Sequence, residues 1–323
     1  MGNKFSQFWP PAPKLTEKNL PDQAGKVFIV TGASSGVGEQ LAQILYQHNA
    51  KVYVAARSEA KASKAISQMK SRFPESKGQL VFLHLDLDDL TTIKASADDF
   101  LRKEARLDVL WNNAGVMIPP QGSKTKQGYE AQLGTNNVAP FLFTKLLHPI
   151  LARTAQQAPA NSVRVVWVSS SGAELMSPKG GIDFDNLDYK TDKSPMVKYC
   201  VSKAGNVLHA SEFAKRAKGE GIVSVSLNPG NLKTELQRHT PSWQMALIWF
   251  LLYEPIYGAY TELFAGLSPT VTEQRNGAWI IPWGRFGPLR KDLLLAQKTE
   301  EEGGTGHAAR FWEWSEEQVR PYV

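Results

Sequence analysis

Apolar runs and amphipathic runs alternate along most of the chain, and this alternation restricts the fold more than any other feature of the sequence. Seven apolar runs have the length and the β-branched content of strands, at residues 26–32, 51–57, 79–87, 107–115, 162–172, 221–230 and 277–282. Helical patterns separate most of them, at residues 36–48, 59–72, 90–105, 125–151 and 198–216. Because the strands are apolar on both faces, they predict a parallel, doubly wound α/β sheet covered by helices on both sides.

The 323 residues predict a single domain with two extensions, since large α/β domains reach this size. We expect a proline-rich N-terminal arm at residues 1–24, one α/β domain at 25–290 and a helical C-terminal tail at 291–323. Within the domain, residues 231–270 are rich in aromatic side chains. They predict a small apolar lobe over the sheet, on the substrate side, and not a second domain.

Charge and metal-ligand content argue against several classes of function. The formal net charge of +6 is spread along the chain without a basic stripe, so we expect no nucleic-acid partner. The single cysteine, Cys200, excludes an intrachain disulfide, and the six histidines have no metal-ligand spacing. The composition therefore predicts a cytoplasmic protein without a metal.

The sequence predicts no stable membrane span. The first residues are polar and rich in proline, unlike a secretory signal, and the apolar stretch 243–253 has about half the length of a span. The start, "MGNKFS", matches the myristoylation pattern at Gly2. Peripheral membrane association through one acyl chain at Gly2 would be weak, and it stays open as an alternative.

The segment "TGASSGVG" joins the first predicted strand to the first predicted helix. Its glycines, Gly32, Gly36 and Gly38, permit a tight turn and let backbone N–H groups at the helix N-terminus approach a pyrophosphate. Strand, glycines, helix and second strand follow in the order that a dinucleotide-binding unit requires. We therefore predict a dinucleotide site at this turn.

The second strand ends at Arg57, where a site that prefers NAD(H) carries an acid for the ribose 2′-hydroxyl. A guanidinium at this position suits a 2′-phosphate. The sequence therefore favours NADP(H) over NAD(H). Stacking of Arg57 on the adenine without selectivity for the phosphate is the alternative.

Tyr199 and Lys203 are four residues apart on a predicted helix, so the phenol and the ammonium lie on one face. From the spacing alone, the pair is either a surface contact or an acid with a shifted pKa. An ammonium about 4 Å away would contribute roughly 4 kcal/mol at an effective dielectric near 20, or about three pKa units. Such a shift would bring the pKa of Tyr199 close to neutrality, where a general acid/base is most effective.

With these motifs in order, the sequence resembles a short-chain dehydrogenase/reductase of the single-domain, Rossmann-like oxidoreductase branch. The resemblance covers residues 24–285 and rests also on "NNAG" (112–115), "VSSSG" (168–172), "YCVSK" (199–203) and "NPGNLKT" (228–234). The arm and the "FWEWSEEQ" segment look like a fungal or retinol-dehydrogenase-like subgroup.

The resemblance implies two sets of site residues. The implied catalytic set is Asn136, Ser170, Tyr199 and Lys203, with Ser171 as the alternative to Ser170. The implied cofactor set comprises Gly32, Ser34, Ser35, Gly36, Val37, Gly38, Arg57, Asp86, Leu87, Asn113, Ala114, Gly115, Tyr199, Lys203, Pro229, Gly230, Leu232 and Thr234. One departure is Ala139, where many relatives have glycine.

The same resemblance implies roles for the catalytic set. Tyr199 would exchange a proton with the substrate oxygen, and Lys203 would depress the pKa of Tyr199 and hold the nicotinamide ribose. Ser170 would hydrogen-bond the substrate oxygen. Asn136 would anchor a water that links Lys203 to solvent.

The predicted function is NADP(H)-dependent interconversion of a lipophilic ketone or aldehyde with its alcohol, running as a reduction in the cell. The aromatic residues of 231–270 suggest the lipophilic substrate, although they fit simple packing of the lobe equally well. The alternatives are an NADP(H)-binding scaffold or sensor without turnover, and a membrane-associated retinoid or sterol dehydrogenase. A homo-oligomer is possible for such a chain.

Overall fold

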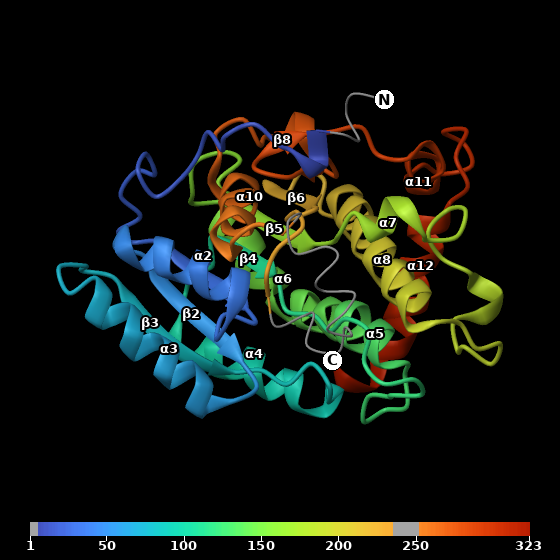
Figure 1. Cartoon of the computed structure of the whole chain (residues 1–323), viewed down its shortest axis with the longest axis horizontal. Coiled ribbons are helices and arrows are strands. Elements are labelled where there is room, and N and C mark those ends of the chain that lie inside the picture. Colours follow the sequence, from blue (N-terminus) through green and yellow to red (C-terminus); the bar gives the residue numbers. More distant parts are fainter. Residues whose placement is uncertain (1–5, 235–251) are drawn as a thin grey trace.

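The computed structural model describes residues 6–234 and 252–323, which fold around an eight-stranded sheet in the order β3-β2-β1-β4-β5-β6-β7-β8 (Figure 1). Neighbouring strands are parallel except for β8, which is antiparallel to β7. The strands are β1 (Val27–Thr31), β2 (Lys51–Ala56), β3 (Gln79–His84), β4 (Val109–Asn112), β5 (Val163–Val168), β6 (Ile222–Leu227), β7 (Trp279–Ile281) and β8 (Arg285–Phe286). The prediction of a doubly wound parallel sheet is confirmed, and β8 adds a short strand that the sequence pattern did not indicate.

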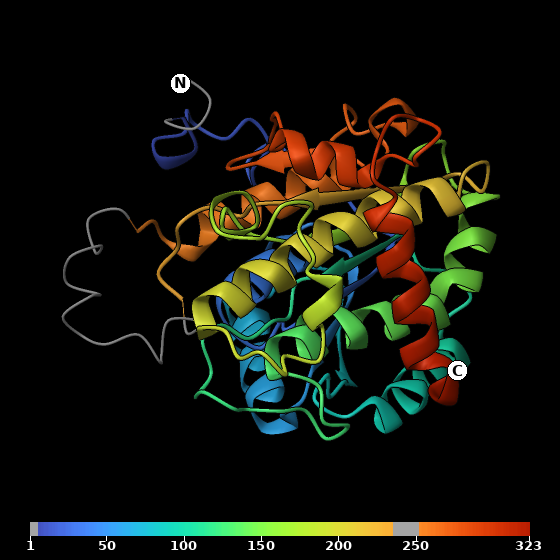
Figure 2. The same ribbon diagram turned by 90° about the vertical axis from the view of Figure 1, so that its right-hand side faces the viewer.

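Helices cover both faces of the sheet, and a separate hydrophobic core lies between each face and its helices. One core lies under α2 (Gly36–Gln47), α3 (Glu59–Arg72) and α10 (Pro255–Leu267). The other lies under α4 (Leu90–Lys103), α6 (Ala139–Ala155), α8 (Pro195–Arg216) and α12 (His307–Val319). In Figure 2 the second layer faces the viewer, with α8 in yellow and α12 in red.

The prediction of one long helix over 125–151 is wrong for its first residues. Residues 124–130 form a loop closed by a bridge between Lys124 and Glu130, and the Glu130 carboxylate caps the short helix α5 (Ala131–Leu133). A π-helical turn, Gly134–Val138, then leads into α6. Pro140 has no N–H to donate within α6, which favours a widened turn just before it, and such turns are frequent at functional sites.

The predicted substrate lobe at 231–270 is only partly within the described residues. Its second half is α10, which packs against α2 and the sheet with Leu263 fully buried, so this part belongs to the main helical layer. Residues 235–251, including most of the apolar stretch 243–253, lie outside the described residues, as does Gly2. Among the described helices, none is long and apolar enough to cross a membrane.

Candidate active site

The predicted catalytic residues converge at the carboxyl edge of β5. Tyr199 and Lys203 come from the first turns of α8, Ser170 follows β5 directly, and Asn136 comes from the π-helical turn before α6. Ser194 caps α8 through its hydroxyl, and Pro195 occupies the first helical position, where no intrahelical N–H bond is required. The chain therefore begins this helix just before the tyrosine.

Tyr199 is held as a neutral phenol. Burial raises the pKa of Tyr199 to about 12, and a hydrogen bond with Ser170 opposes this shift without cancelling it. The expectation that the pKa of Tyr199 lies close to neutrality is therefore wrong for this structure. The physical reason is burial of the phenol, which disfavours the charged tyrosinate. The Lys203 ammonium lies 5.7 Å from the centroid of the tyrosine ring and donates to the carbonyl of Val168.

Lys203 is a buried cation. Its Nζ donates to the carbonyl of Val168 at 2.9 Å, and burial lowers the pKa of Lys203 to about 8, partly offset by the negative charge of Glu262. A Cβ atom at Gly115 would lie 3.3 Å from this Nζ and 3.0 Å from Oδ1 of Asn136. Glycine at 115 therefore lets the "NNAG" backbone approach both side chains.

The Asn136 side chain is fully engaged by the protein itself. Its Oδ1 accepts from the Val116 N–H at 2.8 Å, and its Nδ2 donates to the Val116 carbonyl and to the Ser202 hydroxyl, at 3.0 and 2.9 Å. It therefore ties the loop after β4 to α8, one residue before Lys203. These hydrogen bonds fix the position of the Asn136 side chain between the loop after β4 and α8.

The three consecutive serines have different environments. Ser169 donates to the carbonyl of Lys203 at 2.6 Å, and Ser171 is the N-cap residue of the short helix α7 (Gly172–Leu175). Ser170 accepts from the N–H of Gly172 at 3.1 Å and is the serine that hydrogen-bonds Tyr199. The structure thus brings Ser170, not Ser171, to the phenol.

The glycine-rich turn has the close packing that a dinucleotide site needs. Gly32 and Gly36 have φ of +69° and +61°, a region that favours glycine. A Cβ atom at Gly38 would lie 2.5 Å from Nδ2 of Asn113 and 2.9 Å from the carbonyl of Gly32. The N-cap residue Ser35 makes no side-chain capping bond, which leaves the N–H groups of the first turn of α2 for a ligand.

The remaining predicted cofactor residues surround this turn. Asn113 and Ala114 both donate backbone N–H groups to the Thr31 hydroxyl. The others lie at the carboxyl edges of β2, β3 and β6 or within the turn itself: Ser34, Val37, Arg57, Asp86, Leu87, Pro229, Gly230, Leu232 and Thr234. A Cβ atom at Gly36 would lie 3.8 Å from Thr234, so the segment after β6 meets the turn. The residues present therefore fit a dinucleotide.

Comparison with known proteins points to one family. Residues 26–182 match the short chain dehydrogenase family. A short-chain dehydrogenase/reductase from Phomopsis amygdali is 56% identical over 327 residues, covering 99% of this chain and 97% of the relative. One from Emericella nidulans is 53% identical, covering 96% and 98%. The chain belongs to the short-chain dehydrogenase/reductase family.

Solved structures agree with this assignment at the level of the fold. A protein from Mycobacterium paratuberculosis is 27% identical with a TM-score of 0.69, covering 95% of this chain and 97% of that one. The NADPH-bound carbonyl reductase from chicken fatty liver is 22% identical with a TM-score of 0.62, covering 83% and 99%. The predicted family is thus confirmed, and the relatives named above at the sequence level are fungal.

One buried acid of this short-chain dehydrogenase/reductase escaped the sequence reasoning. Glu262 of α10 is fully buried, and neither carboxyl oxygen has a hydrogen-bond partner among the described residues. Burial raises the pKa of Glu262 to about 8, and the charge of Lys203 opposes this shift. A single carboxylate in the otherwise apolar helix "PIYGAYTELFAGL" was the available signal.

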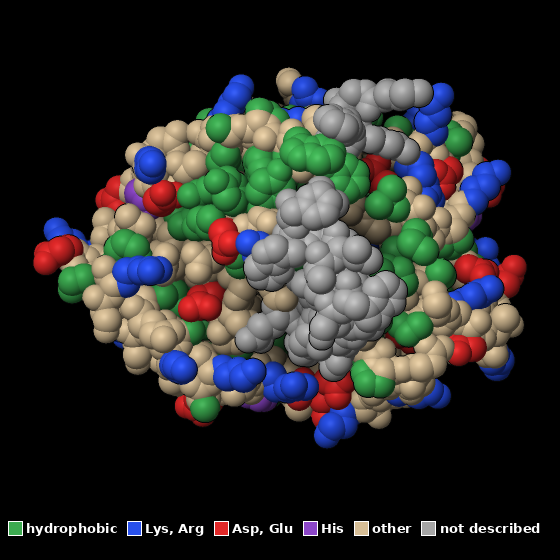
Figure 3. Space-filling model, viewed as in Figure 1, with side chains coloured by type: hydrophobic (Ala, Val, Ile, Leu, Met, Phe, Trp, Pro, Cys, Tyr) green, Lys and Arg blue, Asp and Glu red, His purple; other side chains and the backbone are tan. Residues whose placement is uncertain are grey.

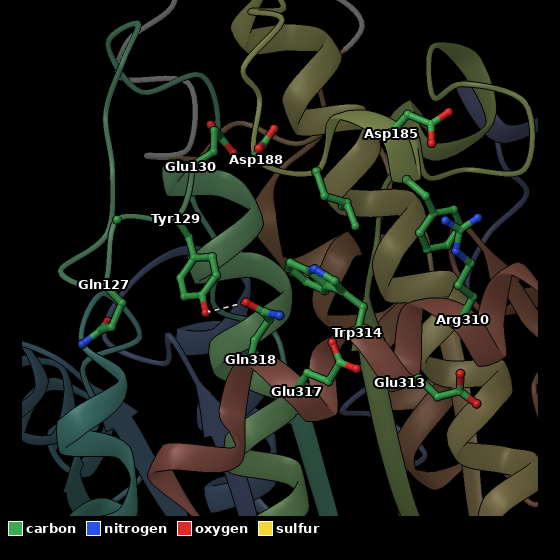
Figure 4. Close-up of a pocket in the computed structure, with 13 residues that line it drawn as sticks. Gln127, Tyr129, Glu130, Asp185, Asp188, Arg310, Glu313, Trp314, Glu317 and Gln318 are labelled. Atoms are coloured by element: carbon green, nitrogen blue, oxygen red, sulfur yellow. Dashed lines mark hydrogen bonds between the residues drawn. The ribbon is translucent and has the colours of Figure 1, made fainter.

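A cavity of about 730 Å³ lies away from this site (Figure 4). It opens between the loop 127–130, the segment 184–188 and α12, and Tyr129 donates to Gln318 at its wall. None of its lining residues belongs to the predicted catalytic or cofactor sets. The cavity therefore adds nothing to the assignment of the active site.

Proposed function

We propose that this protein is an NADP(H)-dependent oxidoreductase that reduces a lipophilic ketone or aldehyde to its alcohol. The observation that carries the proposal is the convergence of Ser170, Tyr199 and Lys203 beside the glycine-rich turn, with Tyr199 held protonated. A protonated phenol is the form that a reduction requires, because the reaction consumes a proton. A nicotinamide cofactor also fits because a related fold is found with NADPH bound in the chicken carbonyl reductase.

Bound at the glycine-rich turn, the nicotinamide cofactor supplies the hydride. Tyr199 Oη then gives its proton to the substrate oxygen, on which negative charge develops, and Ser170 Oγ hydrogen-bonds the same oxygen. Donation leaves a tyrosinate in a buried site, and the positive charge of Lys203 stabilises it there. Asn136 acts as a positioning residue that holds the loop after β4 against α8.

The rate of ketone reduction is expected to fall above a pH of about 8. Burial lowers the pKa of Lys203 to about 8, so its ammonium is present below this pH and is lost above it. The neutral amine stabilises the tyrosinate less, and Tyr199 itself stays protonated in this range because its pKa is raised. A profile of kcat between pH 6 and pH 10 checks this, and a constant kcat throughout would contradict the role of Lys203.

NADPH is expected to support faster turnover than NADH on a panel of lipophilic ketones and quinones. Arg57 is exposed directly after β2 and makes no ion pair with another described residue, so its guanidinium can pair with a 2′-phosphate. A charge-assisted hydrogen bond contributes about 1.5–3 kcal/mol. Arg57→Ala should therefore raise the KM for NADPH roughly tenfold to a hundredfold and leave that for NADH unchanged.

Arg153→Ala is the matched control, because Arg153 is an exposed arginine at the end of α6, outside the site. Equal KM changes for both cofactors in Arg57→Ala would reject the 2′-phosphate contact. Tight NADPH binding without turnover of any ketone in the panel would favour a scaffold or sensor over the oxidoreductase proposed.

A further inference from the structure

The N-terminal arm is anchored at two opposite edges of the sheet. Near the middle of the arm, Glu17 makes two hydrogen bonds. The backbone carbonyl of Glu17 bonds Nε2 of His48 at 2.8 Å, and the Glu17 carboxylate accepts from the Tyr260 hydroxyl at 2.7 Å. His48 follows α2 at the amino edge of the strands, whereas the arm tip, residues 6–9, lies at the carboxyl edge. The tip of the arm, in dark blue in Figures 1 and 2, lies beside β8.

One side chain of the tip, Gln7, joins two walls of the candidate active site. Its Oε1 accepts from Nδ2 of Asn228 at 3.0 Å, and its Nε2 donates to the carboxylate of Glu174 at 3.3 Å. Asn228 is 2% exposed, follows β6 and accepts from the N–H of Gly230. Glu174 lies in α7, four residues after Ser170. A side chain from residue 7 therefore touches the elements that present the catalytic serine and the predicted nicotinamide segment.

Two side chains of the domain, Arg285 and Tyr253, hold the residues on either side of Gln7. Arg285 of β8 donates to the Ser6 carbonyl at 2.7 Å and to the Ser6 hydroxyl at 3.2 Å. The Tyr253 hydroxyl donates to the carbonyl of Phe8 at 3.1 Å. The charge-assisted bond from Arg285 to Ser6 and the bond from Tyr253 to Phe8 fix the backbone on both sides of Gln7. The side-chain amide of Gln7 is therefore positioned for its bonds to Asn228 and Glu174.

Exposed apolar side chains are close in the chain to both partners of the bond between Gln7 and Glu174. Trp9 on the tip is 52% exposed, and Leu175 and Met176 beside Glu174 are 58% and 50% exposed. Of the seven large hydrophobic side chains that are exposed among the described residues, these three are within two residues of Gln7 or Glu174. In the view of Figure 3, hydrophobic side chains gather in the upper half, over α10 and beside α7.

We propose that Gln7 is a specificity-determining residue: it holds the arm tip as a wall of the substrate site, where Trp9, Leu175 and Met176 bind the distal apolar part of an extended carbonyl substrate. The proposal rests on the proposed function and names its substrate class, a carbonyl compound with a long apolar chain. A short carbonyl compound does not reach the wall, so its turnover is independent of the arm.

The test compares 2-butanone with 2-dodecanone at saturating NADPH. Gln7→Glu keeps the bond from Asn228 but places a carboxylate against Glu174, and it should raise the KM for 2-dodecanone about tenfold. The double variant Gln7→Glu/Glu174→Gln restores a donor and an acceptor with their places exchanged, and it should return this KM to within about twofold of the wild type. In both variants kcat and KM for 2-butanone and the Kd for NADPH should be unchanged.

A second readout does not depend on turnover. Cys200 is buried, so in Trp9→Cys a solvent-sensitive fluorophore attaches selectively at position 9. In the NADP⁺ complex its emission should shift with 2-dodecanone and stay constant with 2-butanone. If the emission shifts with 2-dodecanone but the unsubstituted protein turns over neither ketone, the proposed oxidoreductase function is rejected, and contact between the arm tip and the apolar chain still holds.

The opposite results overturn the inference. Turnover of both ketones with a KM for 2-dodecanone that is unchanged in Gln7→Glu would remove Gln7 from the substrate site and leave the proposed function intact. A Gln7→Glu variant that loses activity equally on both ketones and is not rescued by Glu174→Gln would show a general structural role. If the emission of the fluorophore at position 9 does not change with 2-dodecanone, the arm tip does not contact the substrate and the proposal is also rejected.

Discussion

Replacing Tyr199 with phenylalanine is expected to lower kcat for ketone reduction by about three orders of magnitude, within the range of 10²–10⁴ for the loss of a general acid. The phenol is the proton source that the structure places beside Ser170, and its raised pKa keeps that proton on the oxygen at neutral pH. The ring itself remains, so the packing against α7 and the Kd for NADPH should change little. Stopped-flow rates of NADPH oxidation and fluorescence titration with NADPH measure the two quantities.

Tyr189→Phe is the matched control for this experiment. Tyr189 is a partly buried tyrosine, its hydroxyl has no hydrogen-bond partner among the described residues, and it lies outside the predicted site. Its loss of a hydroxyl should leave kcat unchanged. Equal rates for Tyr199→Phe and the unsubstituted protein would refute the proton-donor role and leave the dinucleotide site standing.

Glu262→Gln is expected to make the cofactor-free protein increasingly more stable than the wild type as the pH rises from 5 to 8. Burial raises the pKa of Glu262 to about 8, from the ordinary value of 4.5 for a glutamate. Between these values the folded protein holds a proton that the unfolded chain has lost, so raising the pH removes stability at about 1.4 kcal/mol per pH unit. The glutamine resembles the neutral acid and has no such proton, so the difference reaches on the order of 4 kcal/mol by pH 8.

Urea unfolding of both proteins at each pH measures this difference. Lys203 does not mask it, because its lowered pKa of about 8 changes the stability only above this pH, where the folded protein loses its proton before the unfolded chain does. Glu313→Gln is the control, since its carboxylate is 70% exposed on α12. Parallel stability curves for Glu262→Gln and the wild type would mean that the buried carboxyl is ionised throughout.

The fold could be predicted from the sequence because the signals that specify it are local. Apolar runs such as 26–32 and 51–57 are buried on both faces in β1 and β2, and the helix expected at 59–72 has the same bounds in the structure. The exception is the helix expected at 125–151. There, a carboxylate cap by Glu130 and a widened turn before Pro140 overrode the helical periodicity.

The candidate site could be predicted only as a set of residues. Their spacing placed Tyr199 and Lys203 on one helical face, and the structure brings them together with Ser170 and Asn136. The electrostatics differed from expectation. The i,i+4 spacing says nothing about the carbonyl of Val168, which takes the Lys203 ammonium, nor about the burial that raises the pKa of the phenol. Similarly, the bonds that occupy the Asn136 amide come from residues 20 and 66 positions away.

The sequence by itself determined the doubly wound sheet, the family and the chemical types gathered at the carboxyl edge of the strands. These depend on periodicity, on glycines in a turn and on motif order, all of which are local properties of the chain. Only the tertiary structure decided that Tyr199 is kept protonated, that Glu262 is buried without a partner and that Gln7 reaches Asn228 and Glu174. Each of these depends on desolvation or on contacts between residues far apart in the chain, which exist only once the layers have packed.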